Sequence, residues 1–236
     1  MKINLKLFAS LVTLFAACLV HAAATAPAPG LPVLSVQQVA TDDSTGYATW
    51  CAKTNEIAKA KLGIEGYLHI YTGQTGDHSQ ATFAVSLADS FATLTKNGAA
   101  LQNDPDLIEV RNHLRAIRTL GQRTLYKAVR FDGGNKGASI YNTFANVSDE
   151  AGYLKALDGL RAAFDAHGLK DAKINAYRVV AGRTTFSHLI SINVPSDEAL
   201  AMMLDQLSEP WMGEWLAGAA KYRTVVSNGT YKEITK

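Results

Sequence analysis

A histidine lies between two tyrosines in the segment Tyr67-Leu68-His69-Ile70-Tyr71. Successive side chains of a β-strand point to opposite faces, so the three residues with polar tips would share one face and the two aliphatic residues the other. A histidine can move a proton near neutral pH, and tyrosines can orient an aromatic ring or a phenol. The segment therefore predicts His69 as a candidate catalytic residue, and Tyr67 and Tyr71 as candidate ligand-binding residues.

Two later segments show the same alternation with other polar side chains. Tyr126 and Arg130 fall on one face of a predicted strand, and Asn175 and Tyr177 fall on one face of another. An arginine in such a place could hold a carboxylate or an enolate oxygen. We predict that these four ligand-binding candidates and the residues around His69 face one concave space, the usual form of a ligand site. The alternative is that the same polar groups bond to one another and fill a seam inside the protein.

The histidines do not predict a metal site. His69, His78, His113, His167 and His188 share neither the i, i+4 spacing of a helix face nor the i, i+2 spacing of a strand face. Only the fold could bring metal ligands together.

Residues 1–22 have the layout of a secretory signal peptide, in which two lysines precede a short apolar run and small residues follow it. The run is shorter than the roughly 20 residues of a transmembrane helix. We therefore expect cleavage after Ala22 or Ala24, no transmembrane segment after that, and a secreted protein that is periplasmic if the source is a Gram-negative bacterium. A lipid anchor on Cys18 is the less favoured alternative. Removal of the leader, with its two lysines, leaves a chain of 21 basic and 21 acidic residues. This balance does not indicate a nucleic-acid partner.

Cys51 is the one cysteine that remains once the leader is removed. An exported protein with a single cysteine must keep an unpaired thiol in an oxidising compartment. Cys51 shares helical spacing with Tyr47, Ala58 and Leu62, which places it on the inward stripe of a helix. We predict a buried structural thiol.

The order of predicted elements occurs twice after a Pro- and Ala-rich tether at residues 23–32. Each copy reads strand, helix, strand, strand, helix, strand, and each second helical region is interrupted, near Pro105 in one copy and at Pro210 in the other. The first copy has strands at 33–39, 67–71, 81–87 and 124–131 with helices at 42–63 and 90–120; the second has strands at 140–147, 174–181, 186–194 and 223–231 with helices at 148–168 and 196–220. Pairs such as Tyr47 and Tyr153, or Ser90 and Ser196, recur at a nearly constant separation, which indicates a duplication.

This order predicts the α+β class, with two ferredoxin-like βαββαβ units in tandem. The units span residues 33–132 and 139–236, with a linker at 133–138. Such a unit carries both helices on one face of an antiparallel sheet and leaves the other face bare. Two units in one chain can turn those bare faces toward each other.

The element order, with the helix break before Trp211-Met212-Gly213-Glu214-Trp215, resembles the dimeric α+β barrel superfamily in a fused, tandem form. The resemblance covers nearly all of the chain after the leader. It implies an intrachain barrel with a ligand cavity between the two sheets, and a small-molecule partner, with self-association into a homo-oligomer left open. Members of the superfamily include cofactor-free monooxygenases, isomerising enzymes and haem proteins.

The leading hypothesis is an exported small-molecule-binding protein that uses neither a metal nor a cofactor. One alternative is a cofactor-independent monooxygenase or isomerase that acts on a small aromatic compound. A second is a haem-binding protein resembling the chlorite dismutases. The third is a non-enzymatic structural or interaction protein.

Overall fold

The computed structural model describes residues 30–135 and 138–234. The predicted leader and all but the last residues of the tether lie outside the described residues, as do two residues of the linker. Within the described ranges, no helix combines the length and the apolar character needed to cross a membrane.

The elements follow the predicted order closely. The first half contains β1 (Val33–Ala40), α1 (Ser44–Leu62), β2 (Leu68–Gly73), β3 (Thr82–Ala88), α2 (Phe91–Gln102), α3 (Asp106–Ile117) and β4 (Thr119–Arg130). The second half contains β5 (Ser139–Val147), α4 (Glu150–Ala166), β6 (Lys173–Ala181), β7 (His188–Val194), α5 (Asp197–Asp205), the short 3₁₀ helix η1 (Gln206–Ser208), α6 (Pro210–Ala219) and β8 (Arg223–Glu233).

The first helix of each half begins at the same local structure. Asp43 accepts a hydrogen bond from the backbone N–H of Gly46 at 2.7 Å, and Asp149 accepts one from Gly152 at 3.0 Å. The aspartate thus satisfies a backbone donor that the first turn of a helix leaves free. A Cβ atom at either glycine would overlap the capping carboxylate, so the spacing of aspartate and glycine is a structural motif that both halves share.

The second helical region of each half also begins alike, at a serine cap. Ser90 accepts a hydrogen bond from the N–H of Thr93, and Ser196 accepts one from Ala199. Each region then breaks at a proline, which can begin a helix but cannot continue one. Asp104 supports the first break by accepting a hydrogen bond from the N–H of Asp106 at 2.9 Å.

The eight strands form one closed antiparallel barrel in the order β1-β3-β2-β8-β5-β7-β6-β4. Within each half the order is fourth, first, third, second strand, as a ferredoxin-like unit requires. The halves join where β2 pairs with β8 and where β4 pairs with β6. The second strand of each half therefore pairs with the fourth strand of the other, and the two sheets become one continuous wall.

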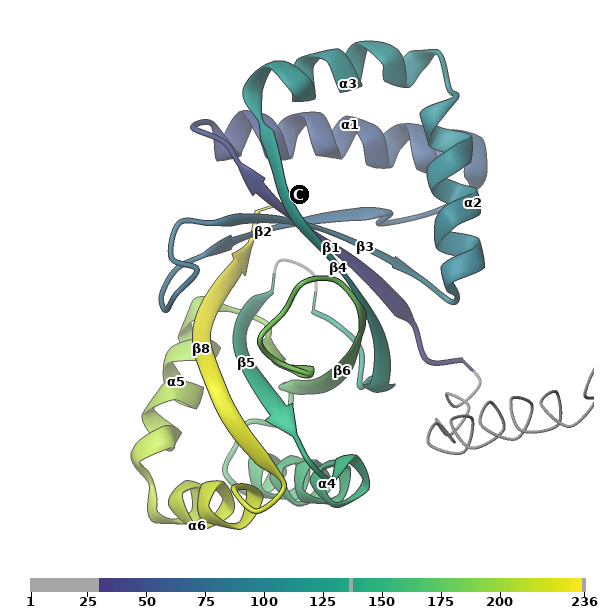
Figure 1. Ribbon diagram of the computed structural model, residues 1–236. Helices are drawn as coiled ribbons and strands as arrows, with labels where there is room; N and C mark the ends of the chain where they lie inside the picture. The colour runs from purple at the N-terminus through teal and green to yellow at the C-terminus, as the bar shows by residue number, and fades with distance from the viewer. Residues whose placement is uncertain (1–29, 136–137, 235–236) are drawn as a thin grey trace, which may run out of the picture.

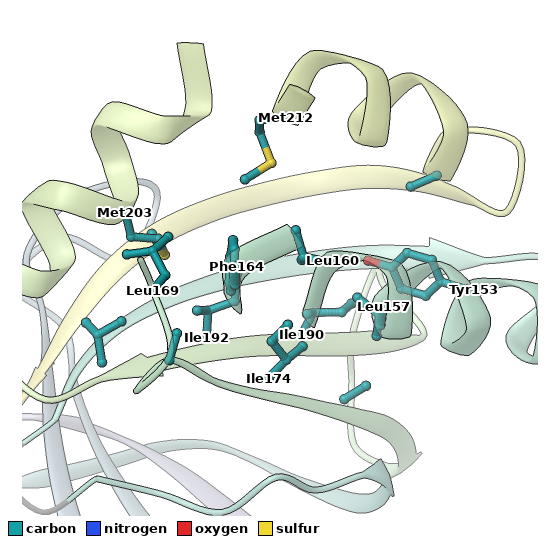
Figure 2. Close-up of a cluster of buried hydrophobic side chains, with 14 of the residues drawn as sticks. Tyr153, Leu157, Leu160, Phe164, Leu169, Ile174, Ile190, Ile192, Met203 and Met212 are labelled. Atoms are coloured by element: carbon teal, nitrogen blue, oxygen red, sulfur yellow. The ribbon is translucent and has the colours of Figure 1, made fainter. Parts of the chain in front are cut away.

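The helices cover the outside of this barrel in two groups. Figure 1 shows α1, α2 and α3 against one side and α4, α5 and α6 against the opposite side. Figure 2 shows the core of the second group, where Leu157, Leu160 and Phe164 of α4 pack toward Ile174 and Ile190 of the sheet. Because the helices fill only the outer faces, the inner faces of both sheets surround the barrel axis.

The largest boundary difference from the sequence-based prediction lies just before β4. The second helical region of the first half was expected to run to residue 120, but α3 ends at Ile117 and β4 begins at Thr119. Leu120 pairs with Val39 of β1. The added ladder hydrogen bonds favour strand over helix at these positions, and a local periodicity does not reveal them.

Candidate ligand-binding cavity

The barrel encloses a cavity of about 700 Å³. Every strand contributes inward side chains to its wall, because alternate residues of each strand face the barrel axis. The apolar part of the lining consists of Leu34, Val36, Phe83, Val85, Leu87, Phe131, Ile140, Phe144, Phe186, Leu189 and Val226. Aromatic rings gather on one side of it, where Phe83 lies 5.8 Å from Tyr231 and Phe144 lies 4.8 Å from Phe186, measured between ring centroids.

His69 forms a short polar contact within the cavity wall. Its Nδ1 lies 2.6 Å from Oε1 of Glu233, whose side chain is only 6% exposed. The two residues belong to β2 and β8, at the junction between the halves. When Nδ1 donates its proton to the carboxylate, Nε2 keeps a lone pair that can accept a proton. The pair is therefore equipped to act as an acid or a base on a molecule in the cavity.

Gly66 leaves room beside the second ring nitrogen of His69. Its backbone has a φ of +58°, in the left-handed region, and a Cβ atom there would lie 3.2 Å from Nε2. Glycine meets both conditions, since it tolerates positive φ and carries no side chain.

Four tyrosines extend into the cavity from different strands. Tyr71 lies on β2, Tyr126 on β4, Tyr177 on β6 and Tyr231 on β8. Burial raises the pKa of each phenol above its usual value near 10. For Tyr71 burial is the largest cause, and the neighbouring Glu233 raises the pKa further. All four side chains therefore stay neutral and can donate hydrogen bonds.

Asparagine and serine side chains supply further polar groups from the second half. Asn175 already uses both ends of its amide, because it accepts a hydrogen bond from the N–H of Asp132 and donates one to the carbonyl of Gly133, each at 2.8 Å. It therefore lines the cavity while it binds the backbone of Asp132 and Gly133. Asn193 donates to Oγ of Ser191 at 3.1 Å.

Five of the seven candidate residues line this cavity. They are His69, Tyr71, Tyr126, Asn175 and Tyr177. Their positions follow the predicted alternation, while their roles toward a ligand remain predictions. The other two candidates lie elsewhere.

The predicted placement of Tyr67 is wrong. Tyr67 precedes β2, so the alternation within that strand does not apply to it, and its ring packs against the buried cluster beneath the helices of the first half.

The predicted placement of Arg130 is also wrong, and a bulge explains why. The register of β4 against β6 shifts between Ala128 and Arg130. An extra residue at such a point reverses which side chains face inward. Phe131 therefore lines the cavity, while Arg130 forms ion pairs with Asp132 at 3.2 Å and with Asp158 of α4.

Other parts of the lining were not predicted from the sequence. Glu233 lies beyond the end of the predicted last strand, and the partner of His69 was therefore not identified. His78 comes from the connection between β2 and β3, where its ring lies within 5.6 Å of Phe83 and 5.5 Å of Phe144 between centroids. If the alternation of the strand at 223–231 is extended by two residues, Glu233 falls on the inward face. No local sequence pattern indicates that His78, in a loop, enters the barrel.

The remaining histidines have structural surroundings. His188 is buried, with Nε2 2.9 Å from Oε2 of Glu150 at the start of α4. His167 stacks on Trp211 at 4.4 Å between centroids. Among the residues that the structure describes, no group of three or more histidine, cysteine or carboxylate side chains could hold a metal ion.

The fold is shared with several solved structures. No protein-family model matches the sequence, and no curated protein matches it significantly. A candidate monooxygenase from Fusobacterium nucleatum has a TM-score of 0.54 at 9% identity, over 86% of this chain and 92% of that one. An anthrone oxidase-like protein has a TM-score of 0.51 at 13% identity, over 86% of this chain and 91% of that one. A chlorite dismutase variant from Candidatus Nitrospira defluvii has a TM-score of 0.51 at 9% identity, with the same two coverages.

These similarities establish the architecture. Identities of this size speak for the fold and not for a shared reaction. The closed eight-stranded barrel, the helices outside it and the structural neighbours together show that the chain has the dimeric α+β barrel fold, with both halves supplied by one polypeptide.

Proposed function

We propose that this protein binds a small, largely apolar aromatic molecule inside its barrel. The observation that supports the proposal is the cavity of about 700 Å³, whose exposed surface is mostly apolar and whose polar side chains converge from several strands. Ligand sites in proteins usually measure about 300 to 1,000 Å³ and have this mixture of groups. A purely structural seam would instead be filled by the side chains of the two sheets, so the cavity argues against the structural alternative.

Binding of Nile red, an uncharged aromatic dye that brightens in apolar surroundings, tests this proposal. Ser191→Trp places an indole in the cavity from β7 and should weaken dye binding at least tenfold. Ser208→Trp is the matched control, because Ser208 is exposed and outside the lining. Circular dichroism reports whether each variant folds, and Leu87→Trp on the opposite wall gives a second blocking variant. Equal dye affinity in the blocked variants and the control would contradict a ligand site in the barrel.

The contact between His69 and Glu233 favours proton transfer as a second function of the same site. An imidazole oriented by a carboxylate can remove a proton from a carbon atom next to a carbonyl group and return it. This is the first step that a cofactor-independent isomerase or oxygenase would need. The structural likeness to an anthrone oxidase-like protein is in keeping with such chemistry.

Deuterium exchange into 2-tetralone, an aromatic ketone with acidic C–H groups, measures this step without assuming a product. His69→Gln should lower the protein-catalysed exchange rate about 100-fold or more, the usual contribution of a positioned base. Its melting temperature and its affinity for Nile red should change little. His78→Gln is the control, since it removes another histidine of the lining. Loss of folding in His69→Gln, or an unchanged exchange rate, would assign His69 to the scaffold.

The lining does not fit haem. Haem carries two propionate groups, and Arg183 is the one lysine or arginine among the described lining residues, which also include the carboxylates of Asp77 and Glu233. Two more carboxylates would set four carboxylates against the one arginine of the described lining. Titration with haemin should therefore give no protein-dependent Soret band, and a stoichiometric band would favour the alternative that resembles the chlorite dismutases.

We also propose that the protein is exported. The sequence of residues 1–22 supports this, and these residues lie outside the part of the chain that the structure describes. N-terminal sequencing of the protein isolated from its native host should begin after Ala22 or Ala24. A chain that still begins at Met1 would contradict it.

A further inference from the structure

We infer that the ligand is an uncharged carbonyl compound whose oxygen is held between the hydroxyls of Tyr71 and Tyr177. The inference rests on the proposed ligand site and specifies which molecules that site selects.

The barrel topology brings these two side chains together. In the closed order of strands, β2 and β6 lie on opposite sides of the barrel, four places apart. Tyr71 of β2 and Tyr177 of β6 both point inward, line the cavity and pack in the same cluster of side chains. One tyrosine comes from each half of the chain, at equivalent strands of the two ferredoxin-like units.

Both hydroxyls are open to the cavity. Within residues 30–135 and 138–234, no protein group forms a hydrogen bond to either phenolic oxygen. The hydroxyl oxygens that are sealed in the protein without a partner belong to Thr72 and Tyr153 instead. A phenol that faces a cavity without a protein acceptor is available to donate to an oxygen of a ligand.

The charges around the pair favour a neutral ligand over an anion. Glu233 lies next to Tyr71, directly across the ladder between β2 and β8. Its own partner is His69, and the one arginine of the described lining, Arg183, comes from the connection between β6 and β7 at the other end of the barrel. A carboxylate or phenolate on the ligand would meet Glu233 in poorly hydrated surroundings, where like charges repel strongly. The phenols stay protonated because burial raises their pKa values, so they donate to a carbonyl oxygen instead.

Three naphthalene derivatives of similar size separate these possibilities. The probes are 1-acetonaphthone, which is a neutral ketone, 1-ethylnaphthalene, which lacks the oxygen, and 1-naphthoate, which is an anion. Displacement of Nile red gives their affinities. We expect the ketone to bind about tenfold more tightly than the hydrocarbon, the gain from one to two hydrogen bonds, and at least tenfold more tightly than the anion.

Variants then assign the preference to the residues. The double variant Tyr71→Phe/Tyr177→Phe should reduce ketone affinity to that of the hydrocarbon and leave hydrocarbon affinity within about twofold. Tyr141→Phe is the matched control, because Tyr141 packs in the cluster beneath the helices of the second half and is outside the lining. Glu233→Gln should reduce the difference in affinity between the ketone and the anion.

The outcomes distinguish this inference from the proposed function. If all three probes bind with equal affinity, or if the double variant keeps the preference for the ketone, the tyrosine pair does not select a carbonyl, while binding in the barrel still holds. If the wild-type protein binds neither Nile red nor any probe, the proposed function fails and the inference fails with it.

Discussion

The surroundings of Cys51 determine the reactivity of its thiol. The side chain is fully buried on the inner face of α1, beside Tyr47. Burial raises the pKa of its thiol to about 11. The reactive thiolate is therefore almost absent at neutral pH, and the fold protects an unpaired cysteine from oxidation.

Thiol labelling tests this protection. In a Cys18→Ser background, Ellman's reagent at pH 8 should leave the native protein unmodified for hours and should react with one thiol as soon as the protein is unfolded in guanidinium. Rapid reaction of the native protein would show that α1 opens locally or that Cys51 is accessible.

Side-chain alternation predicted the inward direction of His69, Tyr71, Tyr126 and Tyr177 without any knowledge of the fold. It could not predict the partner of His69, because Glu233 lies 164 residues away in the sequence. Contacts of that range depend on which strands pair, and no local pattern records the pairing. The direction of a side chain can thus be predicted from its own strand, whereas its contacts with other strands depend on closure of the barrel.

At the scale of elements, the caps of α1 and α4 show the duplication more directly than the residue matches did. Each helix begins at an aspartate whose carboxylate bonds to a glycine N–H three residues later. Loss of such a cap usually lowers the free energy of unfolding by about 1 kcal/mol, and another good capping residue restores most of that stability.

Substitutions at Asp149 measure this contribution. Asp149→Ala should lower the free energy of unfolding by about 1 kcal/mol, as measured by urea denaturation, whereas Asp149→Ser should lose only part of that amount. Equal losses in the two variants would mean that the hydrogen bond to Gly152 does not stabilise the helix.

Helices and strands of strong periodicity were predictable, and local irregularities were not. The bulge after Ala128 inserts one residue into β4 and turns Arg130 outward to Asp158. Strict alternation therefore failed at one position and placed an arginine in the cavity. A bulge depends on how a strand fits its neighbour, which here is β6 of the other half.

At the scale of the whole molecule, the tyrosines are buried both in the barrel and beneath the helices. Eight of the nine tyrosines have a raised pKa, with burial as the largest cause in each case. In the unfolded chain these groups lose their protons near pH 10, whereas in the folded protein they keep them. Their full contribution to stability is therefore present below pH 10 and decreases as the pH rises above it.

Alkaline titration tests this linkage. The free energy of urea unfolding should be nearly constant from pH 8 to 9 and should fall steeply above pH 10. Absorbance at 295 nm should show that most tyrosines ionise together with the loss of the far-ultraviolet circular dichroism signal. Ionisation of most tyrosines near pH 10 in a protein with native circular dichroism would contradict their burial.

The pairing of β2 with β8 has a further consequence for biosynthesis. β8 follows every other strand in the chain, so a ribosome must release almost all of the polypeptide before the wall can close. Until then the emerging first half exposes Leu34, Val36 and Val85 to water, although its outer helices can already have packed. The inner face of the first half is therefore among the last parts of the molecule to be shielded from water.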